Sequence, residues 1–382
     1  VAGHKTQLSR VIRDHAVAMF GGGAVPMIMD GRRVSPVGAA LAGGMTIDSV
    51  DAHDGHKLTK GHVGCGLLPG LLAMCQAQGA EDDRAFLTAW VLGYELATRA
   101  GIALHRTVPD YHTSGAWVAP AVAAVGARVL GLDADRTAHA MGTAEYHGPR
   151  SQIMRCIDHP TMVKDGSGWG AMSGVSAAYL AQAGFTGAPA ITMACDDVAD
   201  LWADLGQRWY MCEQYIKPYP VCRWAQPPAQ AVINLRREHG LASTDVDFIE
   251  IATFHESRRL ATSDPKTTEE AQYSTAYPTA VAMVRGDITP ADIMPSAFGD
   301  PEIQRLAGSM VVTEKQDYND AFPAYRISDV TLHLRDGRRV QSPPTHPLGD
   351  PENPLPLDQV QAKFTRYTTP SLGHGSRAAL AQ

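Results

Sequence analysis

Long apolar runs are missing from this sequence. Although 45% of its 382 residues are apolar, no stretch of eighteen or more consecutive residues is. A helix needs about 20 apolar residues in a row to cross a bilayer, so we expect no contact with a membrane. Residues 1–9 also lack the apolar core and the cleavage site of a secretory signal, which favours a cytoplasmic location.

Positive charge is scarce as well. The chain has 33 basic and 40 acidic residues, which gives a formal net charge of -7. Proteins that bind nucleic acids generally present a broad positive field to the phosphate backbone. We therefore expect no nucleic-acid partner and look for a small-molecule function.

Paired cysteines are the third absence. The six cysteines lie at positions 65, 75, 156, 195, 212 and 222, and no two of them form a CxxC motif. Zinc ribbons and iron-sulfur centres draw their ligands from such closely spaced cysteines. The spacing argues against both kinds of site and favours buried free thiols.

Up to about residue 210 the apolar residues have helical spacing. Between residues 81 and 100, Leu87, Trp90, Val91 and Tyr94 recur on one helical face. Residues 117–130 and 169–183 are rich in alanine, and a glycine follows each of them. Small residues allow close approach of helices, so this pattern predicts a compact helical bundle.

β structure is expected only after this bundle. Residues 246–254 read as a strand, and residues 330–340 contain a hairpin signal, because Asp336-Gly337 separates two strand-like runs. A proline-rich link at 343–356 leads to a short helix at 358–364 that could return to the bundle. We predict a mainly α protein with a helical domain at 1–213 plus 343–382 and a smaller inserted α+β domain at 214–342.

Residues 51–62 form the densest polar cluster, in a glycine-containing loop between two helical regions. Histidine exchanges protons near neutral pH, and a neighbouring carboxylate can orient it, which makes Asp51 and His62 a candidate acid-base pair. His53 and Asp54 lie in the same loop. These side chains could also supply oxygen and nitrogen ligands to a metal, but no HExxH motif is present, so we favour metal-free chemistry.

Three further candidates precede expected helices or a rigid turn. His112 and Lys164 each lie just before a helix, where backbone amides favour an anionic ligand. Arg223 shares with Lys217 a proline-containing turn at the expected domain junction. Taken alone, each has a structural alternative: a capping loop, a surface lysine and a linker, respectively.

Several segments, in this order, resemble the MmgE/PrpD family, which includes methylcitrate dehydratases, cis-aconitate decarboxylase and iminodisuccinate epimerase. They span most of the chain. The matching segments are Asp51 to His62, Gly93-Tyr94-Glu95, Tyr111-His112 ahead of Gly131 to Asp133, Lys164 ahead of residues 174–187, Lys217 to Pro220, Thr268 to Tyr277, and Lys363-Phe364.

The resemblance implies a homodimer whose active site lies between a helical domain and an inserted domain. It also implies catalytic or binding roles for five residues, namely Asp51, His62, His112, Lys164 and Tyr277. The sequence departs from the family pattern at His53, where an aspartate is usual, and at Gly55, where a hydroxyl residue is usual. Gln226 stands where many members carry histidine.

The shared chemistry of such enzymes is the formation of a carbanion beside a carboxylate, whose growing charge must be stabilised. We expect Lys164, Arg223 and His112 to bind carboxylates while His62, oriented by Asp51, moves the proton. Tyr277 would protonate a leaving hydroxyl or an enolate face. Substrate-binding roles are expected for His53, Asp54, Arg223 and Gln226.

The sequence therefore predicts a lyase without metal or other cofactor. Its substrate would be a small polycarboxylate, and the reaction the dehydration of a citrate-like hydroxy acid or the reverse hydration. Two other reactions could use the same set of carboxylate-binding and proton-transferring residues: decarboxylation of an unsaturated tricarboxylate and epimerisation of an imino- or amino-dicarboxylate. A catalytically inactive binding or scaffold protein is the remaining alternative.

Overall fold

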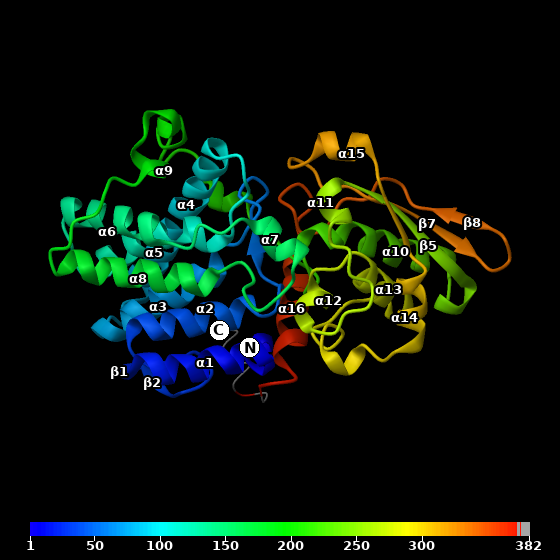
Figure 1. The fold of residues 1–382 in the computed structure, drawn as a ribbon, viewed down its shortest axis with the longest axis horizontal. Coiled ribbons are helices and arrows are strands. Elements are labelled where there is room, and N and C mark those ends of the chain that lie inside the picture. Colours follow the sequence, from blue (N-terminus) through cyan, green and yellow to red (C-terminus); the bar gives the residue numbers. More distant parts are fainter. Residues whose placement is uncertain (373–374, 376–382) are drawn as a thin grey trace.

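The computed structural model describes residues 1–372 and 375, and it is mainly helical, as expected, with a four-stranded sheet and two short two-stranded sheets. Figure 1 shows the bundle of α1 to α9 on one side, the sheet with its helices on the other, and α16 (Leu357–Thr368) between them. Within the described residues, no helix combines the length and apolarity that crossing a membrane requires.

The bundle consists of helices whose ends follow the local signals. Asp82, at the start of α4, accepts a hydrogen bond from the amide of Ala85, and Asp133 caps α6 through the amide of Arg136. The longer helices are α1 (Gln7–Phe20), α2 (Pro36–Asp48), α3 (Gly64–Gln78), α4 (Asp83–Thr107), α5 (Ser114–Val129), α6 (Ala134–His147) and α8 (Ser167–Gln182); α7 (Ile153–Asp158) and α9 (Ile191–Ala194) are short.

Glycines let α2 and α8 touch through their backbones. A Cβ atom on Gly168 would lie 2.5 Å from the carbonyl oxygen of Leu41, and one on Gly44 would lie 2.5 Å from Cα of Gly168. Neither position accepts a side chain without separating the helices. The small residues of the sequence thus have the close-packing role that their abundance predicts.

The helical pattern expected up to about residue 210 is interrupted after α1. β1 (Gly21–Pro26) pairs antiparallel with β2 (Arg33–Val34) directly after α1. Three consecutive glycines, Gly21 to Gly23, disfavour continuation of the helix, and Gly22 has a φ of 79°. Further along, residues 196–201 and 210–213 form 3-10 turns rather than α-helix.

The sheet has the strand order β6-β5-β7-β8. β5 (Val246–Thr253) pairs parallel with β6 (Val311–Glu314) and antiparallel with β7 (Asp329–Leu334), and β7 forms the expected hairpin with β8 (Arg339–Gln341). Around it lie α10 (Gln226–His239), α11 (His255–Arg258), α12 (Thr268–Gln272), α13 (Ala276–Arg285), α14 (Pro301–Gly308) and α15 (Gln316–Ala321).

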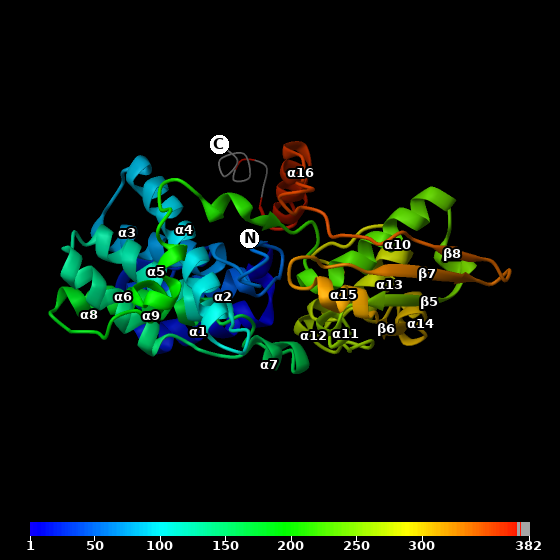
Figure 2. The same cartoon turned by 90° about the horizontal axis from the view of Figure 1, so that it is seen from above.

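The seam between the two halves is a continuous contact. Val50, Cys156 and Ile157, from the helical part of the sequence, pack in the same core as the strands β5 and β7. On α16, which lies over the seam in Figure 2, Lys363 Nζ donates to the backbone carbonyls of Ala52 and Lys217. The division of the chain at residues 213/214 and 342/343 stays a prediction.

Candidate active site

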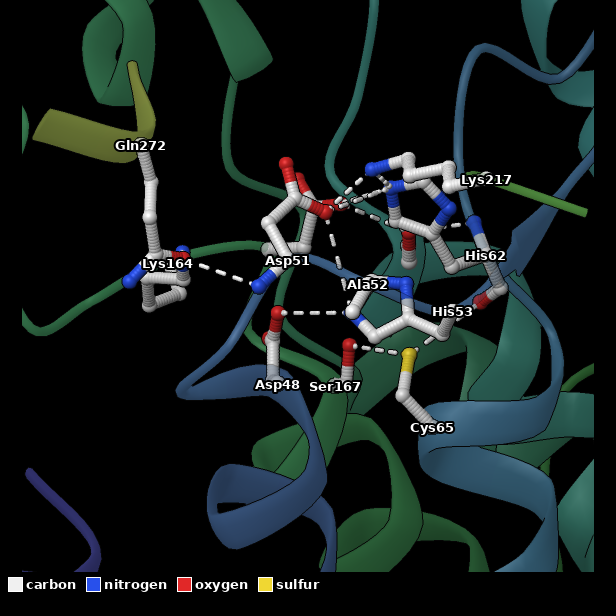
Figure 3. Close-up of polar contacts among 12 residues, drawn as sticks. Asp48, Asp51, Ala52, His53, His62, Cys65, Lys164, Ser167, Lys217 and Gln272 are labelled. Atoms are coloured by element: carbon white, nitrogen blue, oxygen red, sulfur yellow. Dashed lines mark hydrogen bonds and ion pairs between the residues drawn. The ribbon is translucent and has the colours of Figure 1, made fainter. Parts of the chain in front are cut away.

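A two-residue ladder brings the polar loop after α2 against a distant segment. β3 (Asp54–Gly55) pairs antiparallel with β4 (Tyr215–Ile216), and the amide of Lys217 donates to the carbonyl of His53. The side chain of Lys217 is thereby placed among those of the loop, as Figure 3 shows. Lys217 is completely buried.

Asp51 is the centre of this cluster. Its carboxylate, 2% exposed, accepts a hydrogen bond from Lys217 Nζ, and Nε2 of His62 and of His53 lie 3.7 Å and 3.8 Å from the same oxygen. Burial opposes ionisation of this carboxyl, but the adjacent Lys217 ammonium outweighs that effect and holds its pKa well below the usual range. Asp51 is therefore an anion at neutral pH.

Lys164 reaches Asp51 through an amide. Its Nζ donates to Oε1 of Gln272 at 2.7 Å, and the same oxygen accepts the backbone N–H of Asp51 at 2.9 Å. In Figure 3 this pair lies on the side of Asp51 opposite to His62. Lys164 is buried and has a φ of 48°, a backbone conformation that is strained for a residue with a side chain.

The hydrogen bonds of His62 determine which of its nitrogens is free. Nδ1 contacts the carbonyl oxygen of Asp54, which can only accept, so Nδ1 carries the proton. In the neutral ring Nε2 is then a bare acceptor. Burial, and after it the nearby Lys217, lower the pKa of His62 well below its ordinary value, so the ring is a neutral base at pH 7.

Asp165 lies on the other side of that nitrogen. Its Oδ2 is 3.3 Å from His62 Nε2 and accepts a hydrogen bond from the hydroxyl of Ser114 at 3.2 Å. Burial, followed by the charges of Asp48 and Asp51, raises the pKa of Asp165 to about 8. The structure thus holds a protonated carboxyl beside a neutral imidazole, an arrangement that suits general acid and general base roles.

His53 and Asp54 have different surroundings. The His53 ring packs against His62 with centroids 4.3 Å apart, and its Nε2 lies 3.7 Å from an oxygen of buried Asp48. The Asp54 carboxylate accepts hydrogen bonds from the amides of Val63 and Gly64 at the start of α3. Asp54 therefore caps a helix and orients His62, which makes it a positioning residue.

A small cavity opens beside these groups. It is lined by His62, Asp51, Asp165 and Lys217, and further by Lys60, Tyr215, Cys222, Arg223, Tyr273 and Arg326. Its free volume is about 20 Å³, which is room for about one water molecule. Arg223 is paired with Asp350 at 2.6 Å and stacks on the ring of Tyr215.

A larger cavity of about 430 Å³ lies on the Lys164 side of the cluster. Thr113, Gln152, Arg155, Cys156 and Lys164 are among its lining residues. Lys164 and His62 therefore face different cavities, although the Gln272 bridge and the Asp51 charge connect them.

The structure does not bring three predicted residues to this cluster. His112 bonds to the Asp110 carbonyl through Nδ1, and its amide donates to His105. The Tyr277 hydroxyl donates to the carbonyl of Asp292, 2.7 Å away, inside the core beside the sheet. Gln226, fully buried, donates to the carbonyls of Tyr219 and Val221 and so holds the turn that positions Arg223.

Several contributing residues were not among the sequence candidates. Lys217 and Gln272 lie inside segments that carry the family resemblance, and Asp165 directly follows Lys164. Their closeness in sequence to the candidates is the signal that could have identified them as site residues. Asp48 ends α2 just before the polar loop. Arg326 lies in no recognisable motif, and only the fold brings it to the cavity.

One group of side chains has the spacing of metal ligands. Donor atoms of Asp51, His53 and His62 lie within 4.8 Å of one another. The Lys217 ammonium, however, already contacts the Asp51 carboxylate and lies 3.5 Å from His62 Nε2. A metal ion would have to displace this cation, so the donor set fits a proton-transfer cluster better than a metal centre.

Comparison with known proteins identifies the family of the chain. Residues 1–204 match the model of the MmgE/PrpD N-terminal domain, and residues 219–382 match that of the MmgE/PrpD C-terminal domain. A cis-aconitate decarboxylase-like protein of Aspergillus oryzae is 22% identical, over 88% of this chain and 77% of its own length. A cis-aconitate decarboxylase of Aspergillus terreus is 23% identical, over 90% and 76%. The chain belongs to the MmgE/PrpD family.

Proposed function

We propose that the protein is a metal-independent lyase that dehydrates a small citrate-like hydroxy acid, or hydrates the corresponding unsaturated acid. One observation carries this proposal: His62 Nε2 lies 3.3 Å from Oδ2 of Asp165, where burial lowers the pKa of the imidazole and raises that of the carboxyl. Dehydration needs a base and an acid, because a proton leaves one carbon while a hydroxyl leaves its neighbour.

The reaction divides between the residues as follows. His62 Nε2 removes the proton next to a substrate carboxylate, and the electron pair that remains is delocalised into that carboxylate. The ammonium group of Lys217, which lies 3.5 Å from His62 Nε2, stabilises the growing negative charge, and Lys164 holds Gln272 against the backbone of Asp51. As the double bond forms, the carbon-oxygen bond breaks and Asp165 protonates the departing hydroxyl, which leaves as water.

Decarboxylation of an unsaturated tricarboxylate is the second candidate. The names of the relatives support it, since those from A. oryzae and A. terreus are described as cis-aconitate decarboxylase or as similar to it. In this reaction a carboxylate leaves as carbon dioxide and an acid such as Asp165 protonates the resulting carbanion. The low identity, 22% and 23%, makes the relatives a guide to the class of reaction only.

The test is turnover of citrate, 2-methylcitrate and cis-aconitate by the purified protein, with assays for the double bond, for carbon dioxide and for deuterium uptake from heavy water. His62→Gln should lower kcat about 100- to 10,000-fold, the usual contribution of an acid-base group. His239→Gln, at the exposed end of α10, is the matched control and should keep full activity. Full activity of His62→Gln would exclude the proposed base.

The products separate the two reactions. Carbon dioxide release without dehydration would replace the first candidate by the second, and deuterium uptake with neither product would point to epimerisation. The absence of turnover and exchange with every polycarboxylate would leave a binding or scaffold protein. The expected homodimer and cytoplasmic location stay predictions, to be tested by light scattering and cell fractionation.

A further inference from the structure

Two cations in the wall of the small cavity lie beyond ion-pair distance of every carboxylate in the described residues. Lys60 is 9% exposed and Arg326 is 2% exposed, and both line the cavity that contains His62. Within the part of the chain that the structure describes, neither forms an ion pair. Lys217 and Arg223 in the same wall are paired with carboxylates, which makes the other two exceptional.

Both cations are anchored to the same turn, residues 57–60. Lys60 Nζ donates to the carbonyl of Leu58 at 3.1 Å, and its ammonium lies 4.2 Å from the ring centre of Tyr111. Arg326 Nη2 donates to the carbonyl of Lys57 at 3.0 Å, and Nη1 to that of Pro323 at 3.1 Å. These contacts hold the two side chains in place without neutralising them.

Donor hydrogens remain available on both groups. The ammonium of Lys60 has three N–H bonds, of which the Leu58 carbonyl takes one. The Nε of Arg326 is buried without a hydrogen-bond partner. A guanidinium with a free Nε–H is suited to bind a carboxylate.

Keeping these charges buried is unfavourable. Burial, and then the charge of Arg326, lower the pKa of Lys60 to about 8, which shows that the two cations destabilise each other. The backbone of Lys60 adds to the cost, because its φ is 53°. Buried cations outside any ion pair, at the wall of a cavity, suit an anionic ligand that would pair with them.

We infer that Lys60 and Arg326 bind one carboxylate of the substrate, the one farthest from the carbon that His62 deprotonates. This inference rests on the proposed function and extends it. Lys217 stabilises charge at the reacting end, whereas Lys60 and Arg326 select acids that carry an additional carboxylate at the other end. The favoured substrates are therefore tricarboxylates rather than dicarboxylates.

The test measures the binding of two unreactive probes by calorimetry. Tricarballylate has three carboxylates but neither hydroxyl nor double bond, and methylsuccinate is the same molecule without one terminal carboxylate. Lys60→Met and Arg326→Gln should each weaken tricarballylate binding about 10- to 100-fold and leave methylsuccinate binding nearly unchanged. Lys57→Met is the matched control on the same turn, because its ammonium is already paired with Glu352 at 2.6 Å, and it should bind both probes normally.

Thermal unfolding without ligand gives a second readout. Lys60→Met removes an uncompensated buried charge, so its Tm should equal or exceed that of the wild type, whereas a purely structural lysine would lower it on removal. Lys60→Arg, which keeps the charge, should retain most of the affinity for tricarballylate. If Arg326→Gln does not fold, the tricarballylate affinity of Lys60→Met alone tests the carboxylate-binding role.

The outcomes separate this inference from the proposed function. If the wild type turns over a polycarboxylate while Lys60→Met and Arg326→Gln keep its KM and the affinity for tricarballylate, the carboxylate-binding role is refuted and the lyase stands. If the wild type neither binds tricarballylate nor turns over any polycarboxylate, the lyase proposal fails and this role fails with it.

Discussion

Replacement of Lys217 by methionine should destabilise the protein strongly at neutral pH. Asp51 is 2% exposed, and Lys217 is its only direct ion-pair contact among the described residues apart from the two histidines, which lie 3.7 Å and 3.8 Å away. Removal of one partner of a buried pair leaves an uncompensated charge and costs about 3–5 kcal/mol. Urea denaturation at pH 7 measures this loss as a change in the free energy of unfolding.

The double variant Asp51→Asn/Lys217→Met is the control, since it removes both charges. It should recover much of the lost stability, and the double-mutant cycle gives the coupling free energy of the pair. If the double variant is no more stable than Lys217→Met alone, the interpretation of Lys217 as the counterion of Asp51 is wrong.

The pH dependence of this pair has a definite sign. In the wild type the depressed pKa of Asp51 contributes stability above the unfolded value of about 3.9, and this contribution is lost as the pH falls below it. In Lys217→Met the carboxyl pKa is raised instead, so its protonation removes the penalty. The stability deficit of the variant should therefore shrink as the pH falls, and a deficit independent of pH would refute the reasoning.

Three further predictions concern the acid, the helix packing and metal. Asp165→Asn should lower kcat about 100- to 10,000-fold. In the wild type, kcat/KM should fall above about pH 8, where Asp165 loses its proton, and this fall should be absent from the pH profile of the variant. If the variant shows the same fall at high pH, another group is responsible for it. Gly168→Ala should destabilise the fold by about 1–3 kcal/mol in urea denaturation, because its Cβ would lie 2.5 Å from the Leu41 carbonyl, whereas Gly299→Ala, with open space around it, should change stability less. Dialysis against a chelator should leave kcat unchanged, and stoichiometric zinc or iron in active protein, found by elemental analysis, would contradict the metal-free mechanism.

Most of the fold could be predicted because its signals are local. Helix α4 follows from the spacing of Leu87, Trp90, Val91 and Tyr94, and the start of α6 follows from a capping aspartate, Asp133. The β7–β8 hairpin follows from Asp336-Gly337 in the same way. The β1–β2 hairpin was missed because two residues of β2 are too few to show an alternating pattern.

The candidate site was only partly predictable, because its contacts are not local. Asp51 and His62 share a loop and could be recognised together, but the contact of Lys217 with Asp51 joins residues 166 positions apart. The ladder of β3 and β4 that creates this contact is only two residues long on each side. Tyr277 is the opposite case: it lies in a segment that carries the family resemblance, yet its hydroxyl donates to the Asp292 carbonyl inside the core, and its catalytic role stays a prediction.

The roles of Asp165 and Arg326 depend on burial, which a linear sequence does not display. An aspartate next to a lysine is ordinarily ionised, but burial, and after it the charges of Asp48 and Asp51, raise the pKa of Asp165. An isolated arginine is ordinarily at the surface. The burial of Arg326 in the cavity wall becomes apparent only once the fold is known.

The smallness of the cavity beside His62 has a consequence for the timing of catalysis. A polycarboxylate is larger than a space that holds about one water molecule, so we expect the walls of this cavity to move apart before a substrate binds. A movement that separates β4 from β3 would draw Lys217 away from Asp51 and change the charges around His62. The proposed base would then have its present surroundings only after the cavity has closed around the substrate. Product release, which repeats the parting, becomes a natural candidate for the slow step and would show as a burst in rapid-mixing kinetics.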